Sequence, residues 1–281
     1  MRNLRLSKLL EQFGLVLIAL YVLFPIWGII RLAFDGSLHG APTEFRLFPK
    51  ELSLEPFIQV LERPYQSVEF LTLFKNSMYI SVMAAMAAVI MGTSMAYAFA
   101  RFRFPGRQPG LFILLLTAIL PPIAFATPLY ILLNLLHIRT THLGLIIVYA
   151  AFAMPFCIWN MRSAFQSIPK ELEEAAFIDG ASQFKTFMHI SLPLAIPSIA
   201  VAAIIAFLTA YSEFTIGWLF LDKSEKVTLA MAIYAIVQSG QAQPYSQLGS
   251  LAILVSAPAI AIFLLFQNTL LERMMFGSIN D

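Results

Sequence analysis

Long apolar runs separated by short polar breaks dominate the chain. Each run has roughly 20 residues or more, the length a helix needs to cross about 30 Å of hydrocarbon. The breaks contain charged and turn-forming residues, as in 101–106 and 222–226. The pattern predicts six transmembrane helices, at about 13–34, 76–100, 110–136, 143–164, 194–220 and 247–271.

Prolines interrupt two of these runs. Pro121, Pro122 and Pro128 lie inside the third run and Pro197 inside the fifth, so we expect tilted or broken helices there. Strands are not expected, because a lipid-exposed backbone must satisfy its hydrogen bonds within a helix or a closed barrel, and these runs are too long for barrel strands. The predicted fold class is an all-α polytopic membrane protein.

Composition supports a membrane protein and excludes several other classes. Hydrophobic residues make up 59% of the 281 residues and charged residues 12%, whereas a soluble protein has about a quarter charged residues. A net charge of +2 gives no sign of a nucleic-acid partner. The single cysteine, Cys157, rules out an internal disulfide and a cysteine-cluster metal site, and we expect it to serve packing.

The N-terminus is basic at Arg2, Arg5 and Lys8 and then becomes apolar, as in a signal peptide. The apolar run is longer than a secretory signal requires and no small-residue cleavage site follows it. We therefore expect a cytoplasmic tail over 1–12 and a retained first span.

Orientation follows from the distribution of Lys and Arg in the short loops, since these residues favour the cytoplasmic side. Three lie on one side, namely Arg139, Lys223 and Lys226. Ten lie on the other: Arg2, Arg5, Lys8, Arg101, Arg103, Arg107, Arg162, Lys170, Lys185 and Arg273. We expect both termini, including the tail 272–281, in the cytoplasm and the acidic loop 35–75 outside the cell membrane.

The cytoplasmic connection 165–193 predicts two short helices. Pro169 suits a first helical turn, acidic residues follow at the positive end of the helix dipole, and Gly180 can end the helix in the left-handed conformation. A second helix over Gln183–His189 should stop before Pro193. An amphipathic connector lying on lipid would carry Lys and Arg on its polar face. The four acids here favour docking in a protein groove instead.

The residues of this connection resemble the EAA signature of ABC importer permeases. Seven fixed positions over twenty residues match: Glu174, Ala175, Ala176, Gly180, Ile190, Leu192 and Pro193. The flanking Asp179, the Asn76-Ser77 pair and the segment 96–106 are similar to the carbohydrate-uptake branch with six-span, maltose-type subunits. The resemblance implies a type I ABC importer permease fold with a core over 72–271, and a loop whose matching residues couple to an ATPase.

Two segments depart from the family pattern. Relatives often have a Trp-Asn-Glu/Asp-Phe-like stretch where this chain has Tyr211-Ser212-Glu213-Phe214. Many also end in a Gly-rich tail, whereas this chain ends in Phe276–Asp281, which puts a family contact between tail and ATPase in doubt.

The resemblance implies a binding-protein-dependent importer of a sugar or oligosaccharide. The expected partners are a second permease in a pseudo-two-fold arrangement, two cytoplasmic ATPase subunits and an extracytoplasmic binding protein. No phosphate-binding loop G-x-x-x-x-G-K-[ST] occurs, so we expect no catalysis and no cofactor in this chain, with ATP and Mg²⁺ held by the ATPase subunits.

Glu213 is the one acid inside a predicted span, and an ionisable group at membrane depth is a functional candidate. It could accept hydrogen bonds from sugar hydroxyls, with Tyr211 and Asn134 as further candidates for the substrate pathway. The alternative is a structural partner for a nearby polar group. His189 has no predicted ligand partners, so a metal role is not expected.

Three other functions fit the sequence less well. A secondary transporter driven by an ion gradient is the main alternative, but it usually has repeated halves and intramembrane acids. An intramembrane hydrolase needs a nucleophile near a His, or paired acids, within spans, and the four histidines lie in loops or at helix ends. A structural scaffold would leave the signature unexplained.

Overall fold

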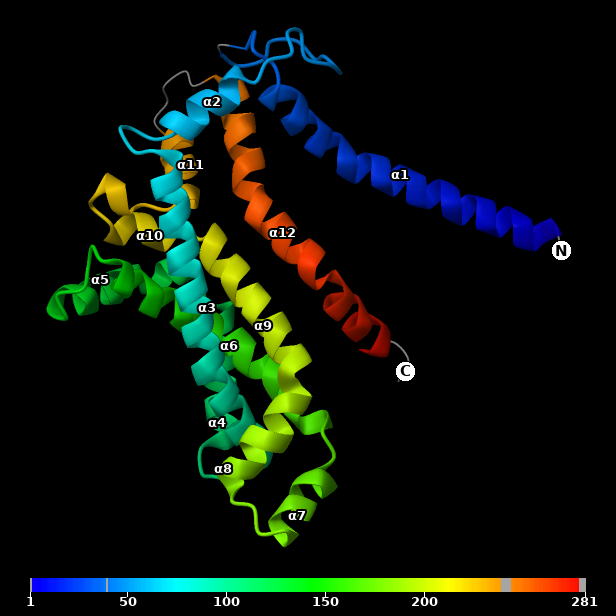
Figure 1. The fold of residues 1–281 in the computed structure, drawn as a ribbon, viewed down its shortest axis with the longest axis vertical. Coiled ribbons are helices and arrows are strands. Elements are labelled where there is room, and N and C mark those ends of the chain that lie inside the picture. The colour runs from blue at the N-terminus through cyan, green and yellow to red at the C-terminus, as the bar shows by residue number, and fades with distance from the viewer. Residues whose placement is uncertain (1, 39, 239–243, 278–281) are drawn as a thin grey trace. The chain divides into compact units, whose positions relative to one another are not determined.

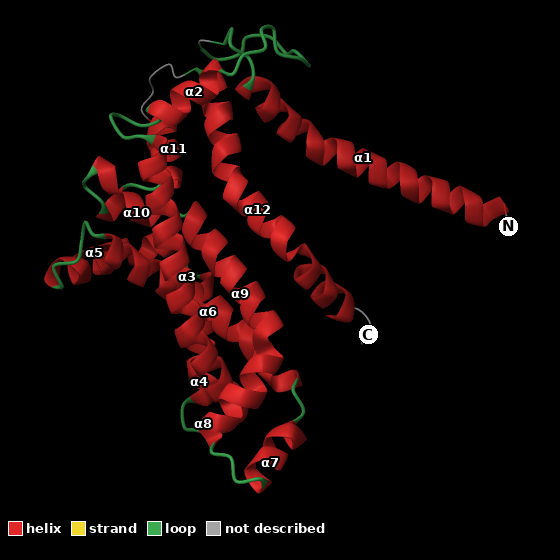
Figure 2. Ribbon diagram, in the orientation of Figure 1, coloured by secondary structure: helices red, strands yellow, loops and turns green. Residues whose placement is uncertain are grey.

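The computed structural model describes the chain except residues 1, 39, 239–243 and 278–281, and describes side chains over 11–267 with the same internal gaps. Its regular structure is helical throughout the described part (Figure 2). The elements are α1 (Arg2–Ala33), α2 (Glu55–Glu62), α3 (Phe70–Arg101), α4 (Arg107–Ile119), η1 (Pro122–Phe125), α5 (Ala126–Leu135), α6 (His142–Ser167), α7 (Lys170–Ile178), α8 (Gln183–Thr186), η2 (Phe187–Ser191), α9 (Leu192–Ser212), α10 (Thr215–Phe220), η3 (Ser224–Lys226), α11 (Leu229–Gln238) and α12 (Tyr245–Gly277).

The described residues contain five helices long and apolar enough to cross a membrane, or six if the bent pair α4 and α5 forms one span. The all-α polytopic fold class is therefore confirmed. The chain divides into two compact units, 1–71 with 233–258 and 72–232 with 259–281. The second unit holds most of the predicted core, and Pro258 marks the boundary within α12.

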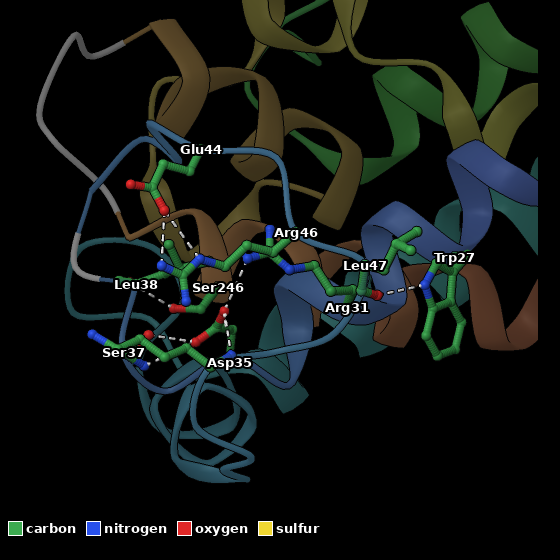
Figure 3. Close-up of polar contacts among 10 residues, drawn as sticks. Trp27, Arg31, Asp35, Ser37, Leu38, Glu44, Arg46, Leu47 and Ser246 are labelled. Carbon is green, nitrogen blue, oxygen red and sulfur yellow. Dashed lines mark hydrogen bonds and ion pairs between the residues drawn. The ribbon is translucent and has the colours of Figure 1, made fainter.

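In the first unit a buried aspartate organises the loop after α1 (Figure 3). Asp35 accepts hydrogen bonds from Arg31 at 3.2 Å, from the Ser37 hydroxyl at 2.6 Å and from the Lys50 amide at 3.2 Å. Burial raises the pKa of Asp35, but the bonds from Ser37 and Lys50 and the Arg31 charge outweigh it and leave the pKa lowered. The carboxylate thus stays ionised and holds the loop to α1.

The first part of α12 packs closely on the end of α1. Ser250 donates to the Ala33 carbonyl at 3.0 Å, and Ser246 donates to the Leu38 carbonyl at 3.1 Å (Figure 3). Gly249 lies against the same turn, because a Cβ there would meet the Ala33 nitrogen at 2.8 Å. Further along α1, apolar side chains from Phe13 to Ile29 are exposed, as suits a helix in contact with lipid or another subunit.

The core of the second unit is formed by α3, α6 and α9 (Figure 1). Gly92 of α3 allows close approach to α6, since a Cβ there would meet Met161 at 3.1 Å and Cys157 at 3.2 Å. Cys157 is fully buried and directs its thiol toward the Ala202 carbonyl of α9 at 3.8 Å. Its predicted packing role agrees with this environment.

Polar contacts join the loops at one end of this unit. Arg139 pairs with Asp222 at 2.7 Å, and Lys226 donates to the Thr140 carbonyl at 2.7 Å. Asn76 and Ser77, near the start of α3, make contacts at the same end. The Asn76 side chain donates to the Glu225 carbonyl at 2.7 Å, and the Ser77 hydroxyl accepts from the Leu229 amide at 2.8 Å. Arg139 and Lys226, which the charge distribution assigned to the same side of the membrane, therefore contact loops at the same end of this unit.

The third predicted span is broken, as its prolines suggested. The helices on either side of the break, α4 and the η1–α5 pair, meet at an angle of 106°. The break falls at Leu120–Pro121, which are extended, because a proline disfavours helical geometry in the residue before it and has no N–H to donate.

Several predicted boundaries were wrong. α1 begins at Arg2, so most of the predicted tail 1–12 is helical, and its residues are mostly good helix formers with no breaker among them. The apolar part of α1, Glu11–Ala33, agrees with the predicted first span within two residues. The second span begins at Phe70 rather than 76. The fifth, predicted over 194–220, ends at Ser212 and resumes as α10. The sixth begins at Tyr245, and α12 reaches Gly277, so the predicted tail 272–281 is helical at first and residues 278–281 lie outside the described part.

Two helices were not predicted at all. α2 lies in the loop predicted over 35–75, and α11 follows η3 after the fifth span. They have eight and ten residues, respectively, and are therefore too short to be recognised as transmembrane spans from the apolar pattern.

Candidate functional site

The first helix of the connection 165–193 forms as predicted and ends at Gly180. α7 covers Lys170–Ile178 with Pro169 directly before it. Gly180 has φ +82°, its N–H donates to the Phe177 carbonyl at 3.0 Å, and the Ala181 N–H donates to the Ala176 carbonyl at 2.9 Å. This pair of bonds is the Schellman motif, which requires a left-handed residue that glycine adopts without steric cost.

The second predicted helix begins correctly but does not stop before Pro193. Ser182 caps α8 by accepting from the Lys185 amide at 3.3 Å. The chain then passes through the π turn η2 directly into α9. Pro193 lies in the first turn of α9, directly after this turn. Pro193 has no backbone N–H to donate to the preceding turn, and the wider π turn accommodates this loss. The helix therefore continues where the sequence predicted an end.

The signature residues on α7 and the following turn are mostly exposed. Glu174, Ala175, Asp179 and Gly180 are exposed and Ala176 is half-buried. Ile190 and Leu192 are half-buried where the chain enters α9, and Pro193 is exposed. The two ends of the signature therefore differ: the α7 end is open to a partner, and the α9 end belongs partly to the chain's own packing.

Several apolar side chains of the connection are exposed, as Glu174 is. Ile178 is 87% exposed and Phe184 is 73% exposed, although both lie in a polar connection. Leu172, Phe177 and Met188 are also exposed. Apolar groups gathered on an exposed surface indicate an interaction site. We call Glu174, Phe177, Ile178 and Phe184 the coupling surface.

α7 is fixed to its own chain by an acid that sequence reasoning did not single out. Glu173 is buried and forms an ion pair with Arg101, Nε to Oε1 at 2.9 Å. Ser191 donates its hydroxyl to the same oxygen at 2.6 Å, and Arg101 donates to the Ile168 carbonyl at 2.9 Å. No local pattern distinguishes Glu173 from its acidic neighbours. The available signal was Arg101, a cation at the end of an apolar run on the same predicted side.

An aromatic cluster lies next to this ion pair. Tyr97, one turn before Arg101, packs against Phe165 of α6 at 5.4 Å between ring centroids and against Phe187 of η2 at 4.7 Å. Phe165 and Phe187 also contact one another at 6.2 Å. The ends of α3, α6 and η2 therefore meet beside α7.

Glu213 is not in the interior of a span. It lies between α9 and α10, and its carboxylate accepts the backbone N–H of Ile216 at 2.9 Å and that of Gly217 at 3.2 Å. The hydroxyl of the buried Tyr149 lies beside the same turn, since a Cβ on Gly217 would meet it at 2.5 Å. The carboxylate thus satisfies the free N–H groups at the start of α10, which is the structural role weighed as the alternative.

The other two candidates for the substrate pathway have partners of their own. Tyr211 is buried and stacks on Phe207 with 5.5 Å between ring centroids. Asn134 is exposed at the end of α5 and accepts from Arg139 Nε at 3.0 Å. A role of Glu213, Tyr211 and Asn134 in substrate passage stays a prediction.

We expect Glu213→Ala to lower the free energy of unfolding by about 1 kcal/mol, the usual effect of removing a helix cap. Glu213→Gln should cost less, because its amide oxygen still accepts one N–H. Thermal unfolding in detergent measures both, with Glu225→Ala, at an exposed acid on η3, as control. Wild-type stability of Glu213→Ala would contradict the capping role. Unchanged sugar affinity and uptake in Glu213→Gln would remove Glu213 from the substrate pathway.

No metal site is formed by the described side chains, since they contain no group of three or more His, Cys, Asp or Glu that could hold an ion. His189 is exposed and its Nδ1 lies 3.0 Å from the Lys185 carbonyl.

Comparison with known proteins identifies the family of the chain. Residues 57–276 match the family described as binding-protein-dependent transport system inner membrane component. The trehalose/maltose transport system permease protein MalG of Thermococcus litoralis is 30% identical over 99% of both chains. The maltodextrin transport system permease protein MdxG of Bacillus subtilis is 26% identical over 97% of this chain and 96% of its own.

The fold also matches a solved importer. A chain of a bacterial ABC transporter that imports the acidic polysaccharide alginate superposes with a TM-score of 0.78 at 21% identity, covering 95% of this chain and 98% of its own. The architecture is thus the type I ABC importer permease fold. The chain belongs to the family of binding-protein-dependent transport system inner membrane components, the permease subunits of ABC importers.

Proposed function

We propose that this chain forms half of the translocation pathway of an ATP-driven importer for a sugar or oligosaccharide and receives the ATPase movement through α7. One observation carries the proposal: α7 is held to its own chain by Glu173 and leaves Glu174, Phe177 and Ile178 exposed. A helix fixed on one side and open on the other can transmit a force applied to its open side.

The coupling surface suits a groove on a cytoplasmic ATPase subunit. Docking a short helix into an apolar groove is a common mode of recognition, anchored by side chains three and four positions apart. Glu174 and Ile178 have this spacing. Ala175 permits close approach, and the Glu174 carboxylate can form a charge-assisted bond with a cation of the partner.

The complete importer contains a second permease in a pseudo-two-fold arrangement, two ATPase subunits and an extracytoplasmic binding protein. The solved alginate transporter, which has the same fold, was crystallised in complex with a periplasmic protein carrying an alginate pentasaccharide. ATP and Mg²⁺ are held by the ATPase subunits, and this chain performs no chemistry. Closure of the ATPase pair shifts its groove and moves the permease between inward- and outward-open states.

The substrate is a carbohydrate. The relatives named above transport trehalose, maltose or maltodextrin by their descriptions, and the alginate importer takes a polysaccharide. The identity of the sugar depends on the binding protein and on cavity side chains from two permease chains.

Both termini lie in the cytoplasm. The charge distribution places Arg101, Lys170 and Lys185 inside and Arg139 and Lys226 outside. In the second unit Arg101 contacts α7, and Arg139 and Lys226 share the outer cluster of loop contacts. The predicted inner side therefore corresponds to the contacts around α7, and the predicted outer side to the loop contacts of Arg139 and Lys226.

Energy source distinguishes an ABC importer from a secondary transporter. We expect proteoliposomes containing the complete complex to import labelled sugar only when they enclose ATP and Mg²⁺ and receive loaded binding protein. A protonophore should leave this uptake unchanged. Uptake that needs no ATP and collapses with the protonophore would contradict the proposal. A thermal-shift screen of the cognate binding protein against a panel of sugars identifies the sugar to use in this assay.

A further inference from the structure

The inner end of α3 is joined to α7 although 72 residues separate the two in sequence. The Arg101 guanidinium is the link: Nε binds the Glu173 carboxylate at 2.9 Å, and a terminal nitrogen binds the Ile168 carbonyl at 2.9 Å. Ile168 is the residue that follows α6. One side chain therefore joins the last turn of α3, the end of α6 and the start of α7.

The carboxylate of Glu173 completes the connection on its other side. Ser191, fully buried at the end of η2 where α9 begins, donates to the same Oε1 that accepts from Arg101. The two ionised side chains are 6% and 7% exposed. A charge-assisted bond at such a site is strong, and removing either partner leaves the other charge buried and unpaired.

Chain connectivity already links α7 to two spans. α6 ends shortly before α7, and α9 follows it through α8 and η2. Movement of α7 reaches these two spans through the backbone, whereas α3 has no such connection. α3 packs on α6 further along the bundle, at Gly92. At the level of α7 itself, the Arg101–Glu173 pair and the contacts of Tyr97 join α3 to the moving segment.

We propose that Arg101 and Glu173 are positioning residues that make the inner end of α3 move with α7, so that it responds to the ATPase together with α6 and α9. This inference rests on the proposed function. α7 still docks without the pair, but its movement no longer reaches the inner end of α3 directly. ATP is then hydrolysed with little import.

The measurement is the number of sugar molecules imported per ATP hydrolysed by the reconstituted complex. We expect Arg101→Ala to lower this ratio at least about fivefold, the lower range of usual coupling effects. Misfolding of part of the sample reduces import and hydrolysis together and leaves the ratio unchanged, so the readout separates coupling from stability. Arg103→Ala serves as the control, because Arg103 is an exposed cation in the loop two residues after Arg101. It should leave the ratio at the wild-type value.

Two further variants test the pairing. Arg101→Ala combined with Glu173→Ala should lower the ratio no more than either single change, because both remove one connection. Ser191→Ala, a small change that keeps the ion pair, should lower the ratio less and covers the case in which the charge variants do not assemble.

A wild-type ratio of sugar imported to ATP hydrolysed in both Arg101→Ala and Ser191→Ala would overturn the proposal. A fall in the double variant equal to the product of the two single falls would overturn it as well. Failure of the proposed function gives a different result, because the wild-type complex would then show no ATP-dependent import.

Discussion

Gly180→Asp and Glu174→Lys are expected to abolish import while leaving the chain folded in the membrane. Gly180 has φ +82° and a Cβ added there would meet no atom within 4 Å, so an aspartate causes only backbone strain, about 1–2 kcal/mol, within its own chain. Glu174 is exposed and Glu173, not Glu174, holds α7 in place. The large effect of either change must therefore arise at the partner surface.

Import of labelled sugar and ATP hydrolysis by the purified complex measure this loss. We expect a fall of at least about tenfold in both, equivalent to about 1.4 kcal/mol of lost interaction. Gly180→Ala is the matched control, because it introduces at least as much backbone strain as aspartate without the charge. Normal coupling in Gly180→Asp or Glu174→Lys would show that α7 does not dock, and complete loss in Gly180→Ala would assign the effect to strain.

Ile178→Asp should separate the ATPase subunits from the permease. Ile178 is 87% exposed, so it contributes little to packing within its own chain. Burying such a side chain in a partner stabilises the complex by about 1.5–3 kcal/mol, and replacing it with a charge should weaken ATPase binding by about 10- to 100-fold.

Titration of the detergent-solubilised permease pair with the ATPase subunits measures this affinity. Leu52→Asp is a suitable control, because Leu52 is 79% exposed in the loop between α1 and α2, on the predicted outer side. Equal affinities of wild-type and Ile178→Asp complexes would exclude Ile178 from the interface.

The connection 165–193 was largely predictable because its signals are local. Pro169 before the first turn, the acids after it and Gly180 at its end determine α7 within a few residues. The spacing from Glu174 to Pro193 then identified the family. Local backbone preferences and motif spacing do not depend on the rest of the fold, so the sequence alone carries them.

Long-range contacts decided what the sequence could not show. Glu171, Glu173 and Glu174 look alike, and only Arg101 and Ser191 determine that Glu173 faces inward. Glu213 looked like an acid within a span because the apolar run hides the helix end at Ser212. The π turn before Pro193 was equally invisible, since its wider hydrogen-bonding pattern has no simple composition signal.

The central claim is that a cytoplasmic ATPase binds the exposed side of α7. Ile178→Cys tests it directly, because the only natural cysteine, Cys157, is fully buried and should not react. A membrane-impermeant maleimide should label Ile178→Cys in inside-out vesicles but not in intact cells, and bound ATPase subunits should protect it. Labelling from outside the cell, or equal labelling with and without the ATPase, would contradict the account.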